Sequence, residues 1–586
     1  MEIRNILQSH IERALRELGI EPAPFVLEHP ADMSHGDYAC NVAMVLAKKL
    51  GENPHSLAEK IANTLQELAI DEVESVTVAG PGFINITLAR NFFTQSLQNI
   101  IEVGPRYGSS DIYKGQTWLI EHTSPNPNKA MHLGHLRNNL TGMAIGNIAT
   151  FVGVHTILDM VDNNRGIAIA KLMWGYLKFA HKQGKEIADV AYWFQHQSEW
   201  KNPITEGRRP DLFVDQLYVQ GSEDFKNSEV EEQVRNFVVL WEDNDEYIRA
   251  LWKTVLDFSY QGQDMTLARL GNRWDYKWHE HEHYQEGKDL VTEGLAKGIF
   301  TKLEDGAILT TLESYNIPDT IVQKKDGTSL YITQDLALTR LKKEKFNPDK
   351  MFWVIGPEQA LAMKQVFAVS EQLGTGKYED FIHISYGYMS LKGEGKMSSR
   401  EGNVVYIDAL IDQTKDALRE NIADMDANLA EQVALAAIKF SILRTGRTVD
   451  MAFDLKNSIS TEGDSGPYLQ YTYARCQSVV QKAKEMGLIS REGVTIIAPE
   501  NNITPVERLL CRFPEVVLLS AQEQTPHHIA NYALELSRAF NSFYAQTKLL
   551  DQENKYAAYN VMMVQAVAQV VSNSLRLLGI QAPEKM

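Results

Sequence analysis

The stretch SPNPNKAMHLGHLRNN, residues 124–139, places two histidines three residues apart, one lysine and four asparagines at the start of a helical pattern of small residues. His132 and His135 share one face of that predicted helix, where free backbone N–H groups and the helix dipole favour an anion. Gly134 lies between them and leaves room for a base or a ribose against the backbone. The stretch therefore predicts a helix start that binds phosphate.

Two other interpretations stay open for the histidine pair taken alone. The imidazoles can serve only to cap the helix. A zinc pair is another option, but zinc requires a further ligand, and no glutamate follows the first histidine as in H-E-x-x-H. A second segment supports the phosphate site, because LKGEGKMSSREGNVV, residues 391–405, is a glycine-flanked loop with Lys396 and paired serines. On its own, this loop is equally typical of a solvated turn.

The segments around residues 124–139 predict an α/β fold. A buried-strand pattern at 117–122 precedes the helix, and a second strand pattern follows it at 155–161. Strand, helix and strand over about 45 residues predict a right-handed parallel crossover. Three later strand-like runs are expected to complete the same sheet: DGAILTTL at 305–312, KMFWVIG at 350–356 and FIHISYGYMSL at 381–391.

The length of 586 residues predicts several domains. Residues 1–112 are predicted to form a small α+β domain. Residues 113–410 are predicted to form a Rossmann-like domain with a parallel sheet, split by a helical, tryptophan-bearing insertion at about 180–300. Residues 411–586 show helical periodicity throughout, which predicts an all-α helical bundle.

Composition limits the class of protein. Lys and Arg number 58 against 76 Asp and Glu, for a net charge of −18, so a nucleic-acid partner requires local basic patches. The three cysteines lie far apart, which predicts neither a disulfide framework nor a cysteine zinc site and favours a reducing cytoplasm. No window reaches the roughly 18 apolar residues of a membrane span, and the first 20 residues predict an amphipathic helix, so we expect no membrane partner.

The two glycine-bearing segments together resemble those of class I aminoacyl-tRNA synthetases, in which a HIGH tetrapeptide and a KMSKS loop mark the nucleotide site. Other stretches make the chain similar to the arginyl-tRNA synthetase family, and they cover most of it outside the insertion. These stretches are EHTSPNPNKAMHLGHLRN at 121–138, YITQDLA at 331–337, GPYLQYTYAR at 466–475, HGDYACNVAMVLAKKLG at 35–51 and VAGPGFIN at 78–85.

This resemblance implies that the chain joins L-arginine to its cognate tRNA through an arginyl-adenylate, with ATP as substrate and release of AMP and pyrophosphate. It further implies Mg²⁺ on the ATP phosphates, a monomer, and a requirement that tRNA bind before activation. By resemblance, the catalytic residues are Lys129, His132, His135 and Lys396, and the ATP-binding residues are His132, Gly134, His135, Lys396, Met397 and Ser398.

The second segment departs from the family pattern in one place. It reads KMSSR, so Ser399 stands where a second lysine is expected to neutralise pyrophosphate. In this family, loss of that lysine commonly accompanies a lysine just before the HIGH segment. Lys129 stands there, and we assign it the compensating role.

Arginine as the substrate also agrees with residue chemistry. A guanidinium is a planar cation that carboxylates and a flat aromatic ring recognise best. Glu121, Asp335 and Tyr331 supply these groups, and Tyr331 and Asp335 would share a helical face. Without the resemblance, that pair is equally typical of an amphipathic helix start. By resemblance, Ser124, Asn126 and Gln359 complete the arginine site.

The resemblance also directs the N-terminal domain to the tRNA elbow and the C-terminal domain to the anticodon. Candidate tRNA contacts are Arg444, Arg447, Tyr468, Tyr471 and Arg475, although we expect at least two of Tyr468, Tyr471 and Tyr473 to pack between helices.

The run WHEHEHY at 278–284 remains open. In a strand, His279, His281 and His283 would share a side as metal ligands, whereas a solvated loop is the simpler interpretation. The family often has an ES pair near here that contacts substrate, and Glu280 or Glu282 are the residues that can replace it.

Two alternative functions are weighed against arginylation. A nucleotidyltransferase of the HIGH superfamily lacks a large helical appendage, so the chain length counts against it. A catalytically silent tRNA-binding paralogue is conceivable because of Ser399. The intact histidines and pocket acids count against this second alternative.

Overall fold

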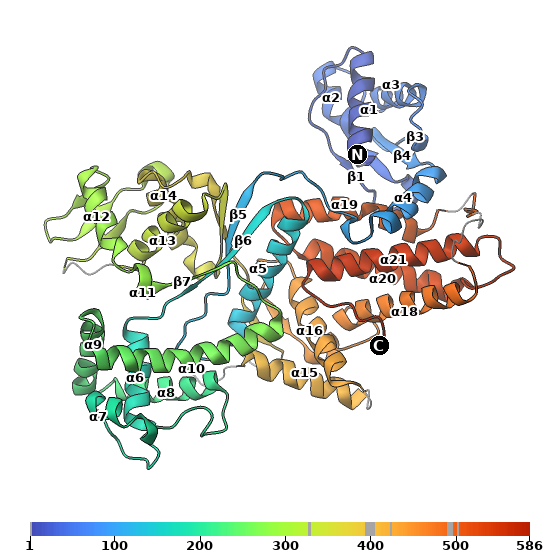
Figure 1. The fold of residues 1–586 in the computed structure, drawn as a ribbon. Coiled ribbons are helices and arrows are strands. Elements are labelled where there is room, and N and C mark those ends of the chain that lie inside the picture. The colour runs from blue at the N-terminus through green and yellow to red at the C-terminus, as the bar shows by residue number, and fades with distance from the viewer. Residues whose placement is uncertain (1–2, 326–329, 393–404, 422–424, 489–495, 501–502) are drawn as a thin grey trace.

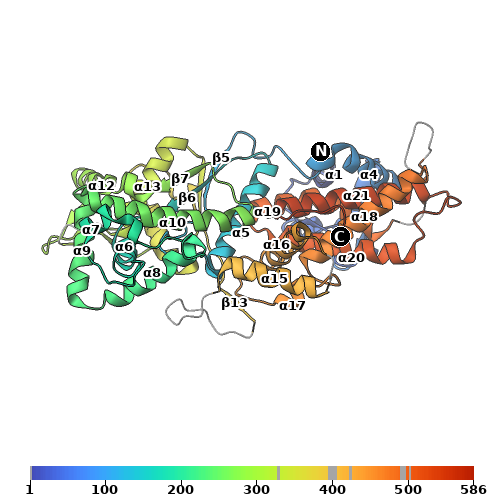
Figure 2. The same ribbon diagram turned by 60° about the horizontal axis from the view of Figure 1, so that its bottom comes forward.

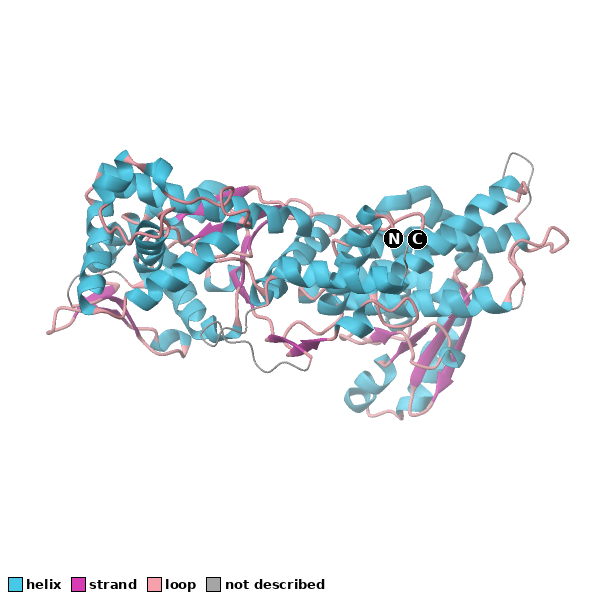
Figure 3. Ribbon diagram, turned by 90° about the horizontal axis from the view of Figure 1, so that it is seen from below, coloured by secondary structure: helices cyan, strands magenta, loops and turns pink. Residues whose placement is uncertain are grey.

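The computed structural model describes residues 3–325, 330–392, 405–421, 425–488, 496–500 and 503–586. Figure 1 shows a parallel sheet at the centre, a green helical insertion on one side of it, and a red helical bundle on the other. The N-terminal domain, in blue, packs on the bundle. Figure 3 shows that helices dominate and that the strands form the central sheet, the N-terminal sheet and smaller separate sheets.

The N-terminal domain is an antiparallel sheet covered by helices. Its strand order is β1-β2-β4-β3, and it has a hydrophobic core of its own that extends to Phe93. Its elements are α1 (Ile3–Glu17), β1 (Leu27–Glu28), β2 (Tyr38–Cys40), α2 (Val42–Leu50), α3 (Pro54–Glu67), β3 (Val73–Ala79) and β4 (Phe83–Leu88), and α4 (Arg90–Val103) follows.

The central sheet has five parallel strands in the order β12-β11-β5-β6-β7. The strands are β5 (Thr117–Glu121), β6 (His155–Asp162), β7 (Tyr276–His279), β11 (Lys350–Val354) and β12 (Phe381–Ile384). Helix α5 (Leu133–Phe151) connects β5 to β6, which confirms the predicted parallel crossover. Because all five strands run the same way, their carboxyl ends meet along one edge, where ligands bind in such folds.

Two expectations for this sheet are wrong. The run at 305–312 contributes β9 (Ile308–Thr310) to a separate antiparallel sheet, between β8 (Phe300–Lys302) and β10 (Thr320–Gln323). An apolar run of this length marks a buried strand but does not identify its sheet. Conversely, β7 joins the central sheet from within residues 180–300, which we expected to be a helical insertion, with a strand only as one option for the run at 278–284. Strand β7 has only four residues, too few to show a clear alternation.

The insertion is built from helices packed around buried tryptophans. Its helices are α6 (Ile167–Phe179), α7 (Val190–Gln195), α8 (Pro210–Asp224), α9 (Ser228–Glu242) and α10 (Glu246–Leu270), and Trp174, Trp193, Trp200 and Trp241 lie in its core. Helices α6 and α8 cross in close contact, because a Cβ on Gly175 would lie 2.0 Å from the Leu217 carbonyl oxygen. Helix α10 then runs from the insertion toward the bundle (Figures 1 and 2).

The carboxyl-terminal domain is helical, as predicted. It comprises α15 (Ile407–Asn421), α16 (Ala427–Leu443), α17 (Leu455–Ser458), α18 (Gly466–Glu485), α19 (Pro505–Glu523), α20 (His527–Gln546) and α21 (Ala557–Leu577). The parallel pair β13 (Met389–Leu391) and β14 (Met451–Phe453) links it to the central sheet. The remaining helices are α11 (Glu280–His283), α12 (Glu286–Ala296), α13 (Tyr331–Phe346) and α14 (Ala360–Gln372). Across the described ranges, no helix combines the length and apolar character that a bilayer crossing requires.

Candidate active site at the carboxyl edge of the central sheet

The start of α5 is capped by its two histidines. The backbone N–H of Gly134 donates to Nδ1 of His132 at 3.2 Å, and the backbone N–H of His132 donates to Nδ1 of His135 at 3.1 Å. A Cβ on Gly134 would lie 3.0 Å from the His132 ring, so the glycine makes room for this cap. Capping alone does not describe the pair, because both histidines also line a cavity.

The hydrogen bonds at the helix start define the tautomer of each ring. A ring nitrogen that accepts a backbone N–H carries no proton, so in both neutral imidazoles the proton is on Nε2. Burial, together with the smaller effect of the Lys129 charge, lowers the pKa of His132 to about 4. Burial, His132 and Lys129 hold the pKa of His135 well below its ordinary value. At neutral pH each ring is therefore an uncharged Nε2–H donor.

The cavity beside these rings measures about 310 Å³. Three segments line it: the start of α5, residues 356–358 after β11, and residues 386–389 after β12. Its volume lies at the lower end of the range for small-molecule sites. Because the last two segments follow the carboxyl ends of neighbouring parallel strands, the cavity occupies the expected ligand edge of the sheet.

Arg137 fastens the start of α5 to the segments across the cavity. Its buried guanidinium donates to the carbonyl oxygens of Gly387 and Tyr388, and also to those of Gly446, Arg447 and Val449, at 2.7–3.2 Å. Burial lowers the pKa of this guanidinium from its ordinary value. The histidine-bearing helix, the loop before β13 and the loop before β14 are thereby joined at one point.

Described residues before and after positions 393–404 both lie beside the histidine-bearing helix start. Residues 393–404, with Lys396, Met397, Ser398 and Ser399, lie outside the described part of the chain. Before them, Met389 of β13 lines the cavity. After them, the Val405 carbonyl accepts the N–H of Leu133 at 2.9 Å, and the Ile407 N–H donates to the Met131 carbonyl at 3.1 Å.

Lys129 is half-buried beside the histidines. Burial lowers the pKa of its ammonium group, while the nearby Asp215 carboxylate of α8 raises it. Asp215 in turn accepts a hydrogen bond from the Tyr406 hydroxyl at 2.5 Å. The charge of Lys129 thus acts on His132, and Asp215 links the lysine to Tyr406.

An acidic group lies at the end of β5, at Glu121, and at the position of β6 that pairs with it, Asp159. Glu121 and Asp159 both contact Nζ of Lys342, at 2.6 and 2.7 Å, and Lys342 is fully buried. Ser124 donates to the other oxygen of Glu121 at 3.4 Å. Lys342 and Asp159 were not predicted from the sequence. Asp159 is the charged residue within the apolar strand HTILDMV, and a charge in such a strand is itself a signal of a buried ion pair.

Asp335 and Glu280 extend this acidic group toward solvent. Asp335 is exposed to solvent on one side, and its pKa is raised to about 7, first by desolvation from the surrounding protein and then by the negative charge of Glu121, while Lys342 opposes the shift and Glu280 adds less. This combination is expected of a carboxylate that solvent reaches from one side. Burial likewise raises the pKa of Glu280 to about 7, and Arg165 opposes the shift.

The other residues predicted for arginine lie farther out. Tyr331 begins α13 and is 88% exposed, and the side chains of Asn126 and Gln359 are also exposed. The structure therefore brings Glu121, Ser124 and Asp335 together, with Glu280 as an addition, and leaves the aromatic ring of Tyr331 apart from them.

The run at 278–284 is neither a solvated loop nor one continuous strand, so the solvated-loop interpretation is wrong. His279 ends β7 and contacts Asp162 at 2.8 Å, His281 contacts Asn164 at 2.9 Å, and His283 is 5% exposed. Within the described residues, no three His, Cys, Asp or Glu side chains form a group that could hold a metal ion.

The candidate tRNA contacts of the helical domain differ in accessibility. Arg444 pairs with Asp464 at 3.0 Å, and Arg447 donates to the Ser385 carbonyl at 2.6 Å. Arg475 lies over Tyr471, which is 39% exposed, and over Tyr544, at 4.7 and 5.0 Å from the ring centres.

The other two tyrosines of α18 pack between helices, as expected. Tyr473 is buried, and the half-buried Tyr468 accepts a hydrogen bond from Asn541 at 2.9 Å. The stack of Arg475 and Tyr471 is therefore the part of this set that can reach a nucleic-acid base.

Three family models match the chain. Residues 3–88 match the arginyl tRNA synthetase N terminal domain, residues 96–455 match the catalytic domain of class I (R) tRNA synthetases, and residues 469–586 match the DALR anticodon binding domain. The matches follow one another along nearly the whole chain.

Curated relatives and solved structures agree with these matches. The chain is 33% identical to an arginine–tRNA ligase of Phocaeicola vulgatus, with 93% of each chain covered, and 32% identical to one of Treponema pallidum, with 97% and 96% covered. The Thermus thermophilus arginyl-tRNA synthetase superposes with a TM-score of 0.77 at 24% identity, and both chains are fully covered. The Plasmodium falciparum enzyme superposes with a TM-score of 0.78 at 19% identity, with 100% of this chain and 98% of that chain covered. These two structures share its fold, and from the family models and the curated relatives we conclude that the chain belongs to the arginyl-tRNA synthetase family.

Proposed function

We propose that this chain joins L-arginine to its cognate tRNA at the expense of ATP, and that the cavity beside His132 and His135 receives the nucleotide. The observation that carries the proposal is the pair of uncharged Nε2–H donors at a helix start, with Met389 lining the same cavity and Val405 hydrogen-bonded to Leu133, the residue after His132. A triphosphate requires such donors, and here they lie next to an acidic group suited to a guanidinium.

In the proposed first step, the arginine carboxylate attacks the α-phosphate of ATP in line and pyrophosphate leaves. His132 and His135 donate from Nε2 to phosphate oxygens, and Lys129 and Lys396 add positive charge as negative charge develops. Gly134, Met397 and Ser398 complete the ATP site. A ribose hydroxyl of the bound tRNA then takes the arginyl group and AMP leaves.

Asp335 and Glu280 are proposed to bind the substrate guanidinium. Glu121 shares its charge with the buried Lys342, so it orients the site more than it neutralises the ligand. The sequence left open whether Glu280 or Glu282 replaces the ES pair of the family, and we propose Glu280. Ser124, Asn126, Tyr331 and Gln359 are proposed to complete the site. A lysine substrate lacks the planar fork and would leave a carboxylate unpaired.

The raised pKa values of Asp335 and Glu280 predict a pH-dependent KM for arginine. Only the ionised carboxylate binds a guanidinium well, so KM for arginine is expected to fall about tenfold between pH 6 and pH 8, through the pKa of about 7. KM for ATP at saturating Mg²⁺ should stay flat, because His132 is neutral throughout this range. Steady-state exchange kinetics at several pH values measure both constants.

The variant Glu280→Gln is the control for this pH dependence. It removes one of the two titrating groups, and the change in KM for arginine should become smaller. A KM for arginine that does not vary between pH 6 and pH 8 would contradict the assignment of these two acids.

Mg²⁺ is proposed to accompany the ATP phosphates. Glu358 is the carboxylate among the described residues that line the cavity. Mg²⁺ is commonly bound by one carboxylate together with phosphate oxygens and waters, so Glu358 is the residue that would hold it. The charge of Mg²⁺ would help to neutralise the phosphates. Zinc has no part in the proposal, since the three cysteines are too far apart in the sequence to form a cysteine zinc site.

We also propose a cytoplasmic monomer, in agreement with three unpaired cysteines. Its domains are proposed as residues 1–112 toward the tRNA elbow, 113–410 for catalysis and 411–586 toward the anticodon. In the last of these, Arg444, Arg447, Tyr468, Tyr471 and Arg475 remain the proposed tRNA contacts, with Tyr471 and Arg475 the most accessible pair.

Pyrophosphate exchange into ATP tests the proposal. Exchange by the unmodified chain should require both arginine and cognate tRNA, and Lys129→Ala should slow it by about 10- to 100-fold because a phosphate-neutralising charge is lost. Unchanged exchange would remove Lys129 from the reaction. Exchange with another amino acid would reassign the specificity, and no exchange under any condition would favour a silent tRNA-binding paralogue.

A further inference from the structure

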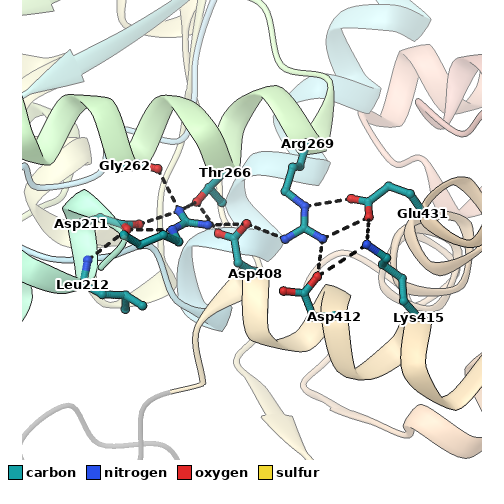
Figure 4. A network of polar contacts seen from close by, with 10 residues as sticks. Asp211, Leu212, Gly262, Thr266, Arg269, Asp408, Asp412, Lys415 and Glu431 are labelled. Atoms are coloured by element: carbon teal, nitrogen blue, oxygen red, sulfur yellow. Dashed lines mark hydrogen bonds and ion pairs between the residues drawn. The ribbon is translucent and has the colours of Figure 1, made fainter. Parts of the chain in front are cut away.

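Asp408, in the first turn of α15, is the meeting point of an ion-pair network between the insertion and the helical domain (Figure 4). Its carboxylate contacts Nη1 of Arg209 at 2.6 Å and Nη1 of Arg269 at 2.7 Å, and the Thr266 hydroxyl donates to it. Arg209 immediately precedes α8, while Thr266 and Arg269 lie on α10. The Asp408 side chain is 13% exposed, so these contacts are largely shielded from water.

Asp408 directly follows the residues that pair with the histidine-bearing loop. Tyr406 forms an antiparallel bridge with His132, and the backbone hydrogen bonds of Val405 and Ile407 lie on either side of it. A carboxylate held by two arginines therefore anchors the chain next to the backbone that holds His132.

The insertion also holds the other side of this pairing. The Gln263 amide, on α10, donates to the carbonyl oxygens of Asn126 and Lys129 at 3.1 and 3.2 Å. Asp215, on α8, accepts from the Tyr406 hydroxyl. Helices α8 and α10 thus contact both the loop before His132 and the segment 405–408 that pairs with it.

The acids of the network differ in what they connect. Arg209 also pairs with Asp211, and Arg269 also pairs with Asp412 and Glu431. Within the described residues, Asp408 is the acid that both arginines share. If it lost its charge, Arg269 would still join α10 to Asp412 and Glu431 of the helical domain, whereas Arg209 would keep Asp211 at the start of its own helix α8. The helical domain would therefore stay attached to α10 while the link of the insertion to residues 405–407 weakened.

We propose that Asp408 is a positioning residue for the ATP step, which it serves by holding residues 405–407 against the loop that carries His132. The inference rests on the proposed ATP site at His132. Asp408 itself touches no substrate. It acts through the backbone, and its effect should therefore fall on ATP and not on arginine.

The test compares Asp408→Asn with Asp412→Asn in tRNA-dependent pyrophosphate exchange. Asp412 contacts the same Arg269 from one helical turn farther on and is 58% exposed, so it is a matched control. Asp408→Asn is expected to lower kcat/KM for ATP by about 10- to 100-fold, as a displacement of about 1 Å at a reacting group can do, and to leave KM for arginine within about twofold. Asp412→Asn should leave both constants within about twofold, because exposed ion pairs contribute little.

Asp408→Glu should recover part of the loss, since it restores the negative charge. Equal effects of Asp408→Asn and Asp412→Asn would overturn the inference, as would a parallel change in KM for ATP and arginine, which indicates general damage to the fold. If Asp408→Asn does not fold, Thr266→Val removes one donor to Asp408 and keeps the arginine pairs. A smaller rise in KM for ATP is then expected, and an unchanged KM would overturn the inference.

Failure of the ATP site itself gives a different result. If His132→Ala leaves KM for ATP and the exchange rate unchanged, the nucleotide site is misplaced, whatever Asp408 does. If His132→Ala impairs exchange and Asp408→Asn does not, only the positioning role is lost.

Discussion

Replacing His135 by alanine is expected to lower the rate of tRNA-dependent pyrophosphate exchange by about 10²- to 10³-fold, the usual cost of removing one positioned donor from a transition state. The ring of His135 is uncharged and carries its proton on Nε2, because Nδ1 accepts the backbone N–H of His132. Because the ring already carries this proton, it can donate a hydrogen bond to the phosphate without first gaining a proton when negative charge develops. The measurement is exchange at saturating arginine, ATP and tRNA.

A second variant separates catalysis from helix capping. His135→Asn can keep an oxygen near the His132 N–H but does not reach as far as Nε2, so it should retain the stability of α5 and still lose exchange. Loss of the cap alone would lower stability by about 1 kcal/mol, which thermal unfolding detects. Full exchange by His135→Ala would show that this ring only caps the helix.

The variant Asp335→Asn is expected to raise KM for arginine by about ten- to a hundredfold. Asp335 is exposed to solvent, and loss of a hydrogen bond to a charged group costs about 1.5–3 kcal/mol, where each 1.4 kcal/mol is about tenfold in affinity. KM for ATP should change little, because Asp335 is not among the described residues that line the cavity. The measurement is the arginine dependence of exchange at pH 8, where the native carboxylate is ionised.

The same variant should become more stable to unfolding at pH 8. The pKa of Asp335 is raised above its value of 3.8 to about 7, so the folded state disfavours the charged form, and this penalty grows as the pH rises from about 4 to 7. Asparagine removes it along with the repulsion from Glu121. An unchanged KM for arginine would exclude Asp335 from the guanidinium site, and lower stability at pH 8 would contradict its pKa.

Local patterns were sufficient to predict the central fold. The strands at 155–162, 350–354 and 381–384 were expected from continuous apolar runs, which are typical of buried parallel strands. The same reasoning assigned 305–312 to the wrong sheet and missed β7, because a run of three or four residues contains no information about its partner strand.

The site was predicted where one segment supplied its residues, and missed where distant segments meet. His132 and His135 lie in one helix start, so spacing alone indicated their shared role. Lys342 reaches Glu121 across 221 positions, and Arg269 reaches Asp408 across 139. No periodicity relates residues so far apart, and only folding shows which charges compensate one another.

The way in which Arg137 is bound affects how this region can evolve. Its guanidinium contacts main-chain oxygens at all five of its hydrogen bonds, so side-chain replacements at those five positions leave the acceptors in place. Homologues that share about a third of their residues can therefore keep these hydrogen bonds of Arg137 while the side chains around them change. Gly387 is the exception, because a Cβ there would lie 2.5 Å from the Val449 carbonyl, and natural variation at that position should be the most restricted of the five.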